Sequence, residues 1–491
     1  MTVDDLVAIT GGTVSPGGSV DLETSIAGVT EDSRKVVSGS VFVAISGETV
    51  DGHDFVEEAS ARGACVIITD SPEKIPESVS KFVVPHARRA LGIIAHALVD
   101  DPSGKMTVIG VTGTNGKSST VTMICHLLEY TGHKTASFGT LGYTIGGKTR
   151  EAAHTTPFNE DLAALFAEAR DAGDTHVVME VSSHALEQER VSGIAFDVGL
   201  FTNLTQDHLD YHKTMDEYIE AKLKLFSEIE SDSGITIANA DDPVSERFRE
   251  ASRVSHYAFG KNGDVSVSDV EFKGNRNRFT IASPWGTGAF DMALPGKHNV
   301  SNVVGAVTVC GALGVEIGLL QEGVSSMPSV PGRFEVIDCG QPFQVVVDYA
   351  HTEDGLLNVL TAAREVCSGR IIAIFGCGGD RDKTKRPKMA AVVARLADFG
   401  IVTSDNPRSE SPERILMDIE VGMPHAGRKS DEDYLVIEDR TEAIHRGLAM
   451  AGSGDLVLIA GKGHEDYQIL NSGTIHFDDR EVARECLRGR G

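Results

Sequence analysis

The sequence predicts an α/β protein of three domains, and three observations support that prediction. The chain has 491 residues, too many for a single hydrophobic core. Short apolar runs of strand length alternate with helical patterns, which is typical of mostly parallel sheets covered by helices. One of these runs enters a glycine-rich turn and then a helix, and ligands of such sheets collect at this carboxyl edge.

The first 102 residues form the predicted N-terminal domain. Strand-like runs stand at residues 41–45 and 82–84, and Pro85 stops the second run. The turn sequence Asp101-Pro102-Ser103-Gly104 closes the block. We therefore place the first domain boundary between residues 102 and 103.

Residues 103–334 form the predicted central domain, which ends near Pro331-Gly332-Arg333, and residues 335–491 form the C-terminal domain. In the central domain, buried strands are expected at 176–181, 197–202 and 235–239. In the C-terminal domain they are expected at 345–348, 371–375, 400–404 and 456–460, and each runs into glycine or polar residues. These patterns predict a P-loop-type mononucleotide-binding parallel sheet in the centre and a Rossmann-like C-terminal domain.

The strongest motif lies at residues 106–124, where an apolar strand, a turn ending Gly116-Lys117-Ser118 and a helix start follow one another. This order surrounds a phosphate with backbone N–H groups, with Lys117 over the terminal phosphates and Ser118 available to Mg²⁺. Val111 stands where the full P-loop pattern has its first glycine. An ordinary strand-to-helix turn is the alternative, but the flanking strand and helix and the glycines favour an ATP site: Gly110, Gly113 and Gly116.

Composition excludes several classes of protein. The net charge of −27 argues against general binding to nucleic acid or to anionic membranes. Seven cysteines without a C-x-x-C pair fit a reducing cytosol better than a disulfide framework. The first residues carry no basic signal-peptide region, and the chain has no apolar run of membrane-spanning length. We therefore expect a cytoplasmic protein without membrane insertion.

Two further candidates follow strands of the central domain. Glu180 lies at the end of one strand, where its carboxylate could hold Mg²⁺ beside the phosphates; a helix-capping or exposed acid is the alternative. His208 and His212 are four residues apart, but Leu209 occupies the place of the glutamate that a zinc-protease motif needs. We favour a single histidine at a second Mg²⁺ position, or one hydrogen-bonded in the pocket wall.

The C-terminal domain carries a basic run inside this acidic protein, with cations at Arg381, Lys383, Lys385, Arg386 and Lys388. Its position after a strand favours an anion site over a solvated loop. Two more polar runs follow strands, Asp405-Asn406-Pro407-Arg408 and Gly461-Lys462-Gly463-His464-Glu465. An arginine can clamp a carboxylate and a glutamate can pair with an ammonium group, so together these runs predict an amino-acid site.

With these motifs the chain resembles the Mur ligases of peptidoglycan synthesis, and within them the MurE type. The ordered matches extend over almost the whole chain, at residues 32–34, 51–53, 113–118, 155–157, 180–184, 207–212, 221–222, 296–302, 331–333, 348–351, 380–382, 405–408 and 461–465. Two positions depart from the family pattern. Glu353 replaces a proline and is expected to alter a loop rather than the chemistry, and Ser118 is a conservative replacement for threonine.

The resemblance implies roles for individual residues. It implies an ATP site at Gly113, Thr114, Asn115, Gly116, Lys117, Ser118, Ser119, His298, Asn299, Asn302, Arg333, Asp348 and His351. It implies two Mg²⁺ ions held by Ser118, Glu180 and His208, and a catalytic set of Lys117, Glu180, His208 and a carbamylated Lys222. Without the resemblance, Lys222 would be a surface lysine of an amphipathic helix. The UDP-sugar peptide is expected at Ser33, Thr155, Thr156, Ser182, Gln188 and Arg190, and the amino acid at Arg381, Asp405, Asn406, Arg408, Gly461 and Glu465.

The reaction that the resemblance implies joins meso-diaminopimelate to UDP-N-acetylmuramoyl-L-alanyl-D-glutamate. ATP drives it through an acyl phosphate, and the enzyme is expected to be a monomer. Arg408 together with Glu465 favours diaminopimelate, because its distal end carries a carboxylate and an ammonium group whereas that of lysine carries only the ammonium. The alternatives are the same ligase adding L-lysine, a folylpolyglutamate synthetase-like ligase, and a non-catalytic nucleotide-binding protein.

Overall fold

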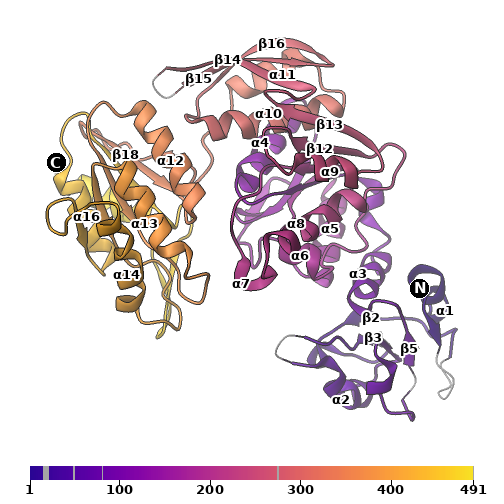
Figure 1. The fold of residues 1–491 in the computed structure, drawn as a ribbon. Helices are drawn as coiled ribbons and strands as arrows, with labels where there is room; N and C mark the ends of the chain where they lie inside the picture. The colour runs from indigo at the N-terminus through magenta and orange to yellow at the C-terminus, as the bar shows by residue number, and fades with distance from the viewer. Residues whose placement is uncertain (15–20, 48–49, 80, 274–275, 490–491) are drawn as a thin grey trace.

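The computed structural model describes residues 1–14, 21–47, 50–79, 81–273 and 276–489, and these form three α/β units that follow one another along the chain (Figure 1). The mixed α/β fold class with mostly parallel sheets is confirmed. The proposed boundaries after residues 102 and 334 fall between the sheets of neighbouring units. Within the described ranges, no helix combines the length and the apolar character needed to cross a membrane.

The N-terminal unit is built on a five-stranded sheet with the order β1-β5-β4-β3-β2. Its strands are parallel except β1, which runs antiparallel to β5. The elements are α1 (Val3–Thr10), β1 (Thr13–Val14), β2 (Gly28–Thr30), β3 (Ser40–Val43), α2 (Val56–Ala61), β4 (Val66–Thr69), β5 (Lys81–Val83) and α3 (Ala87–Leu98). The predicted strand at 41–45 is shorter than expected, because Gly52 N donates to the Ile45 carbonyl and turns the chain there.

The central unit contains an eleven-stranded sheet with the order β16-β15-β14-β13-β12-β11-β6-β10-β7-β8-β9. The strands from β14 to β7 in that order are parallel, as predicted, whereas both ends continue as antiparallel hairpins that the sequence did not reveal. The strands are β6 (Thr107–Thr112), β7 (Thr135–Gly139), β8 (Gly142–Ile145), β9 (Lys148–Arg150), β10 (His176–Glu180), β11 (Val198–Phe201), β12 (Ile235–Asn239), β13 (Ser255–Gly260), β14 (Val265–Lys273), β15 (Arg276–Ser283) and β16 (Gly286–Met292).

Helices cover both faces of this central sheet. On one face α4 and α10 bury an apolar cluster with strand residues such as Ile109 and Val111, and on the other face α5 and α8 pack around Val108. Near-continuous burial of β6, β10 and β11 follows from this double cover. The helices are α4 (Lys117–Tyr130), α5 (Asn159–Ala172), α6 (Ser183–Glu187), α7 (Leu209–His212), α8 (Met215–Ser227), α9 (Ser245–Ala251), α10 (Lys297–Ala312) and α11 (Ile317–Ser325).

The C-terminal unit has a six-stranded sheet with the order β17-β18-β22-β19-β20-β21, parallel except for β17. A separate hairpin, β23 with β24, follows it. The elements are β17 (Glu335–Val336), β18 (Gln344–Asp348), α12 (Glu353–Val366), β19 (Ile371–Phe375), α13 (Lys385–Leu396), β20 (Phe399–Val402), α14 (Pro412–Glu420), α15 (Gly422–His425), β21 (Tyr434–Val436), α16 (Arg440–Met450), β22 (Leu456–Ala460), β23 (Tyr467–Leu470), β24 (Gly473–His476) and α17 (Asp479–Arg488). The predicted strands at 371–375 and 456–460 have the observed bounds, while the one predicted at 400–404 ends at Val402 because Ser404 N donates to Glu438 O instead.

Candidate active site

The predicted phosphate loop joins β6 to α4, as the sequence indicated. Gly113 has φ +146° and Gly116 has φ +82°, both in the range that favours glycine. A Cβ at Gly113 would lie 1.9 Å from Thr202 Oγ1, and one at Gly116 would lie 2.4 Å from Asn302 Oδ1. The backbone can therefore pass close to its neighbours only because these positions have no side chain, and the α4 N-terminus begins directly at Lys117.

A cavity of about 250 Å³ lies beside this loop, between the central unit and the start of α12. Four of the predicted ATP residues do not line this cavity but lie on the phosphate loop itself: Gly113, Thr114, Lys117 and Ser118. Arg333 Nη2 donates to Ser118 Oγ at 3.1 Å, so the connection between units reaches the phosphate loop. The structure thus brings nine of the predicted ATP residues to one cavity: Asn115, Gly116, Ser119, His298, Asn299, Asn302, Arg333, Asp348 and His351.

Lys222 is the residue whose setting differs most from its local sequence pattern. Its exposed fraction is 1%, so the interpretation as a surface lysine of an amphipathic helix is wrong. Lys222 Nζ donates to the Gly113 carbonyl at 2.9 Å, and Lys117 Nζ donates to the same carbonyl at 2.9 Å. Burial, reinforced by the charge of Lys117, holds the pKa of Lys222 well below its usual range.

Glu180 is buried, with an exposed fraction of 1%, so the alternative of an exposed acid is wrong. Its carboxylate accepts from Thr140 N at 2.7 Å and from Thr140 Oγ1 at 3.3 Å. A Cβ at Gly139 would lie 2.4 Å from Glu180 Oε1, so the carboxylate packs directly on the backbone at the end of β7. No ion pair of Glu180 is found among the residues that the structure describes.

His208 and His212 make different contacts. His212 Nε2 lies 2.9 Å from Ser183 Oγ, whereas His208 Nε2 lies 3.4 Å from Asp207 Oδ2. Burial lowers the pKa of His208 to about 3, although the Asp207 carboxylate opposes the shift. His208 is therefore a neutral imidazole at pH 7, the form that has a free lone pair for a ligand.

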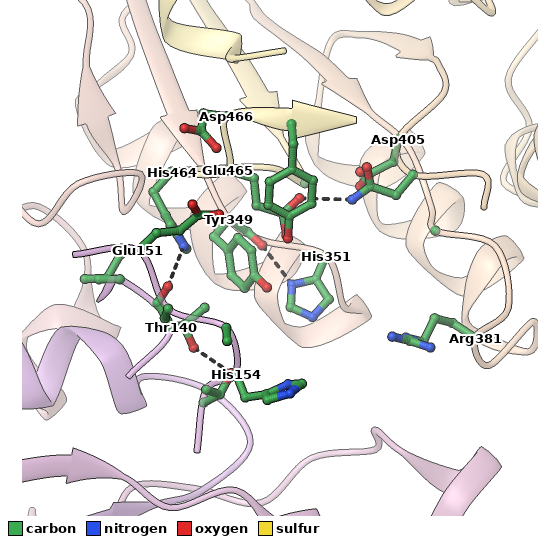
Figure 2. Close-up of a pocket in the computed structure, with 18 of the residues that line it drawn as sticks. Thr140, Glu151, His154, Tyr349, His351, Arg381, Asp405, His464, Glu465 and Asp466 are labelled. Carbon is green, nitrogen blue, oxygen red and sulfur yellow. Dashed lines mark hydrogen bonds between the residues drawn. The ribbon is translucent and has the colours of Figure 1, made fainter. Parts of the chain in front are cut away.

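A larger cavity of about 680 Å³ lies between loops of the central unit and the strand ends of the C-terminal unit. Its central-unit side includes Thr140 and His154, and its other side includes Tyr349 and His464 (Figure 2). His208 also lines the central-unit side of the cavity. All six residues predicted for the amino acid line it: Arg381, Asp405, Asn406, Arg408, Gly461 and Glu465.

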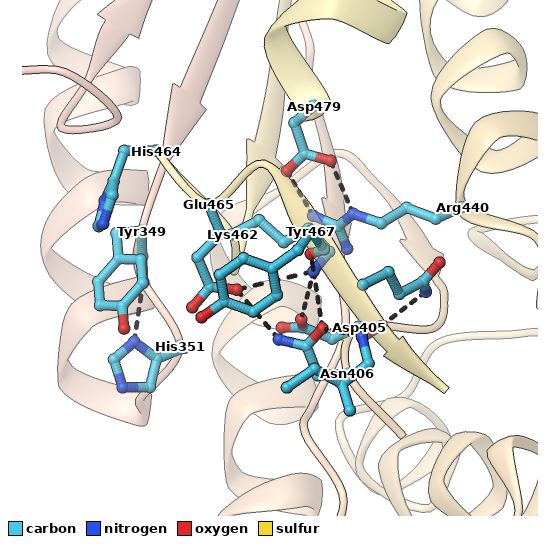
Figure 3. A network of polar contacts seen from close by, with 12 residues as sticks. Tyr349, His351, Asp405, Asn406, Arg440, Lys462, His464, Glu465, Tyr467 and Asp479 are labelled. Carbon is cyan, nitrogen blue, oxygen red and sulfur yellow. Dashed lines mark hydrogen bonds and ion pairs between the residues drawn. The ribbon is translucent and has the colours of Figure 1, made fainter. Parts of the chain in front are cut away.

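Below the cavity, a buried network fixes the amino-acid loops (Figure 3). Lys462 is fully buried and donates to Asn406 Oδ1 at 3.0 Å and to Tyr467 O at 2.7 Å, while its Nζ lies 3.4 Å from Asp405 Oδ1 and 3.7 Å from Glu465 Oε2. Asn406 Nδ2 in turn donates to Glu465 Oε2 at 3.0 Å. Burial, with the charge of Asp405, raises the pKa of Glu465 to about 6, and Lys462 acts in the opposite direction.

A second buried pair lies under the same loops. Arg440 and Asp479 are paired at 2.7 Å, and neither side chain is exposed. Arg440 also donates to the carbonyls of Ser404 and Ala460, which precede the two amino-acid loops. The pair therefore ties the chain after β20 to the end of β22.

The basic run divides into two groups, and only part of it faces the large cavity. Arg386 is buried and pairs with Glu410 and Asp418, and Lys383 also pairs with Glu410. Lys388 donates to Gln206 Oε1 at 2.9 Å across the units. Only Arg381 and Lys385 of the five cations line the large cavity.

Five of the residues predicted for the UDP-sugar peptide gather around the end of β10. Thr155 Oγ1 lies 3.0 Å from Thr140 Oγ1, and Thr156 Oγ1 donates to Glu180 O at 2.9 Å. Ser182 caps α6, and Arg190 donates to Gln188 Oε1 and to Thr156 O. Ser33 instead lies in the N-terminal unit, where it donates to Glu58 Oε2 at 3.1 Å, and it lines neither cavity.

Sequence reasoning missed several residues of the site, and four of them illustrate why. His464, Tyr349 and Thr140 line the large cavity, and Asp354 accepts from Asn115 Nδ2 at 2.8 Å. His464 and Tyr349 lie within motifs that the sequence did single out, so their neighbours provided a signal. Thr140 and Asp354 carry no local signal of this kind.

The comparisons with known proteins agree with this site. Residues 25–99 match the family described as "Mur ligase family, catalytic domain", residues 111–310 match "Mur ligase middle domain", and residues 332–463 match "Mur ligase, glutamate ligase domain". A Geobacillus kaustophilus protein named "UDP-N-acetylmuramoyl-L-alanyl-D-glutamate--2,6-diaminopimelate ligase" is 43% identical over 485 residues, which is 97% of each chain.

Solved structures extend the comparison to the fold. A structure of a UDP-N-acetylmuramoyl-L-alanyl-D-glutamate--2,6-diaminopimelate ligase aligns with a TM-score of 0.71 and 30% identity, covering 100% of this chain and 99% of the other. A Mycobacterium tuberculosis folylpolyglutamate synthase aligns with a TM-score of 0.62 and 17% identity, covering 75% of this chain and 91% of the other, which shows a common fold only. The chain therefore belongs to the Mur ligase family and is an ATP-dependent ligase.

Proposed function

We propose that this chain joins meso-diaminopimelate to UDP-N-acetylmuramoyl-L-alanyl-D-glutamate, with ATP as the second substrate, in peptidoglycan synthesis. The named relatives support this assignment, since the full-length match at 43% identity carries that activity in its name. The folylpolyglutamate synthase is far less similar, at 17% identity, and covers less of the chain. We therefore favour the muramoyl peptide over a folate as acceptor of the amino acid.

The observation that carries the proposal is the mixed charge of the large cavity. Arg408 and Glu465 line it together. Asn406 lies between them, since its side-chain amide donates to Glu465 and its carbonyl accepts from Arg408. A cation beside an anion matches the distal end of diaminopimelate, which carries a carboxylate and an ammonium group. The distal ammonium of L-lysine would leave the arginine without a carboxylate partner, a desolvation cost of about 1–3 kcal/mol or more. This geometry favours diaminopimelate over lysine.

The first chemical step would take place between the two cavities. The terminal carboxylate of the muramoyl peptide attacks the γ-phosphorus of ATP, the bond to the β-phosphate oxygen breaks, and ADP leaves. Lys117 stands at the N-terminus of α4, where its ammonium group and the loop N–H groups can offset the charge on the phosphates. The Thr155–Thr156 segment beside Glu180 would orient the peptide end.

In the second step, the amine of diaminopimelate attacks the carbonyl carbon of the acyl phosphate, and phosphate leaves as the amide forms. The attacking amine must be neutral, so it loses a proton to a nearby base. Arg408, Asn406 and Glu465 would hold the distal end of the amino acid and so fix the position of the reacting amine. The closeness of the central and C-terminal units would limit the access of water to the intermediate.

We also propose two Mg²⁺ ions, held by Ser118, Glu180 and His208 together with phosphate oxygens. The residues fit such ions, because Glu180 is a buried carboxylate that accepts from Thr140 and forms no ion pair among the described residues. The described residues contain no preformed group of three or more His, Cys, Asp or Glu side chains, which is consistent with ligands that are shared with the nucleotide. When bound, these ions would neutralise charge on the phosphates.

Carbamylation of Lys222 is part of the same proposal. Lys222 is buried beside Lys117 on one carbonyl oxygen, and its lowered pKa favours the neutral amine that can react with CO₂. The carbamate would carry a negative charge and so pair with Lys117 and support a cation. We further propose the division into domains at residues 1–102, 103–334 and 335–491, a monomeric state and a cytoplasmic location.

An ADP-release assay tests the proposed function. With the UDP-muramoyl dipeptide and meso-diaminopimelate together, we expect ATP turnover that depends on both, because the acyl phosphate is consumed only by the amine. Turnover with a folate and glutamate would assign the chain to the alternative ligase. No turnover with any pair of acceptor and amino acid would support a non-catalytic nucleotide-binding protein.

A further inference from the structure

The loop that ends in Glu465 makes a contact across the two units. His464, the residue before Glu465, places its Nε2 3.1 Å from the carbonyl oxygen of Thr140, which belongs to the central unit (Figure 2). A carbonyl can only accept, so Nε2 carries the proton and His464 is the donor. Burial lowers the pKa of His464 to about 4, so the imidazole is neutral at pH 7 and has one N–H to donate.

Thr140 also forms hydrogen bonds to the predicted metal ligand Glu180. Its amide and its hydroxyl donate to the two oxygens of the Glu180 carboxylate, at 2.7 and 3.3 Å. Thr140 therefore accepts a hydrogen bond from His464 of the amino-acid loop through its carbonyl, and it donates to Glu180 through its amide and hydroxyl. Away from the connection near residue 334, two other side-chain hydrogen bonds join the described parts of these units, Asn115 to Asp354 and Lys388 to Gln206.

The position of His464 is set by the backbone around it. Gly463 has φ +57°, and a Cβ at Gly332 would lie 2.2 Å from His464 N, so the loop rests on the connection between the units. The His464 ring packs on Tyr349 with the ring centroids 5.3 Å apart. Arg480 Nη2 also donates to the His464 carbonyl at 3.2 Å. A shift of the amino-acid loop would therefore move the His464 donor.

We propose that His464 is a positioning residue that couples the amino-acid site to the ATP site through Thr140. The amino acid, by bridging Arg408 and Glu465, orders the loop and holds the His464 donor on the Thr140 carbonyl. This contact fixes the backbone that presents its amide to Glu180, beside the phosphate loop. The proposal rests on the proposed function, because it takes the large cavity as the amino-acid site and the smaller one as the ATP site.

Coupling between two binding sites is reciprocal, so it can be measured without turnover. We would titrate β,γ-methylene ATP into the enzyme by calorimetry in magnesium buffer, with and without saturating meso-diaminopimelate and with the muramoyl peptide absent. In the wild type, diaminopimelate is expected to tighten nucleotide binding by about fivefold or more, which is the lower range of such couplings.

Two variants separate the hydrogen bond from packing. His464→Phe keeps a ring against Tyr349 but has no N–H, and we expect its nucleotide affinity to change less than twofold on adding diaminopimelate. His464→Gln keeps an N–H donor, the side-chain amide, at about the distance of Nε2 from the backbone. We expect this variant to retain most of the coupling. His476→Ala, which removes an exposed histidine of the same unit, is the matched control and is expected to behave like the wild type.

The outcomes distinguish this proposal from the proposed function. If the wild type binds neither diaminopimelate nor the nucleotide, both proposals fail. If it binds both ligands independently, or if His464→Phe keeps the full coupling, only the role of His464 is wrong. Loss of coupling in His464→Gln as well as in His464→Phe would also contradict a role for the hydrogen bond.

Discussion

Lys117 and Lys222 donate to the same backbone carbonyl, that of Gly113, each at 2.9 Å. Two ammonium groups on one buried oxygen repel each other, and the described residues contain no carboxylate that forms an ion pair with Lys222. The pKa of Lys222 is accordingly held well below its usual range, by burial first and by Lys117 second. A buried amine that is easily deprotonated, beside the phosphate loop, is the feature on which the chemistry of this site depends.

The first prediction concerns Lys222. Lys222→Ala is expected to lose activity by about a hundredfold or more, because the proposed carbamate that faces Lys117 is removed. A small carboxylic acid such as acetate, added at high concentration, should restore part of the activity by occupying the space. Lys224→Ala, which removes a partly exposed lysine of the same helix that pairs with Glu187, is the control. Full activity of Lys222→Ala without rescue would contradict the carbamate.

The second prediction is a pH dependence from Glu465. The pKa of its carboxyl is raised to about 6, chiefly by burial, so the carboxylate that pairs with the distal ammonium is lost as the pH falls through 6. The value of kcat/KM for meso-diaminopimelate should then fall by about tenfold for each pH unit below this value. Glu465→Gln should show no inflection near pH 6; persistence of the inflection in this variant would assign it to another group.

The third prediction concerns Lys462, whose charge lowers the pKa of Glu465. In Lys462→Met a side chain of similar length remains, but Asp405 and Glu465 lose the ammonium group that lies near both of them. We expect the inflection in the pH profile to move upward from 6, and KM for diaminopimelate to rise at neutral pH. Lys429→Met, at an exposed ion pair, should leave the profile unchanged. A pH profile of Lys462→Met identical to that of the wild type would show that the charge of Lys462 does not affect the pKa of Glu465.

The fourth prediction concerns the cation that reads the distal carboxylate. Arg408 has φ +53°, so asparagine, which tolerates this region, is a better replacement than alanine. Arg408→Asn is expected to raise KM for meso-diaminopimelate by about 10–150-fold, since a hydrogen bond to a charged group contributes about 1.5–3 kcal/mol. The KM for L-lysine should change little or fall. An equal loss for both amino acids would mean that Arg408 does not recognise the second carboxylate.

Much of the fold was accessible from the sequence because buried parallel strands are continuous apolar runs. The runs at 235–239, 371–375 and 456–460 have the bounds of β12, β19 and β22. The hairpins at the edges of the central sheet were missed, because strands such as β15 alternate buried and exposed residues and lack such a run. Strand order and edge pairing also depend on tertiary contacts that no local pattern records.

Site residues could be predicted from the sequence where the residue type alone indicates the chemistry. The glycines of the phosphate loop and the charged residues after β20 and β22 are of this kind. The burial of Lys222 could not be predicted, because an amphipathic pattern does not reveal which polar position of a helix faces a tertiary partner. The contact between His464 and Thr140 joins residues 324 positions apart, and neither residue has a pattern that points to the other.

The most direct test of the central claim is a competition between two amino acids. Wild-type enzyme would receive ATP, the UDP-muramoyl dipeptide and equal concentrations of meso-diaminopimelate and L-lysine, and mass spectrometry would measure the two tripeptide products. Arg408 and Glu465, which line the cavity together, predict the diaminopimelate product in excess by about a hundredfold or more, because lysine would leave the half-buried arginine without a carboxylate partner. A product that is mainly the lysine tripeptide would contradict the assignment of the amino-acid site.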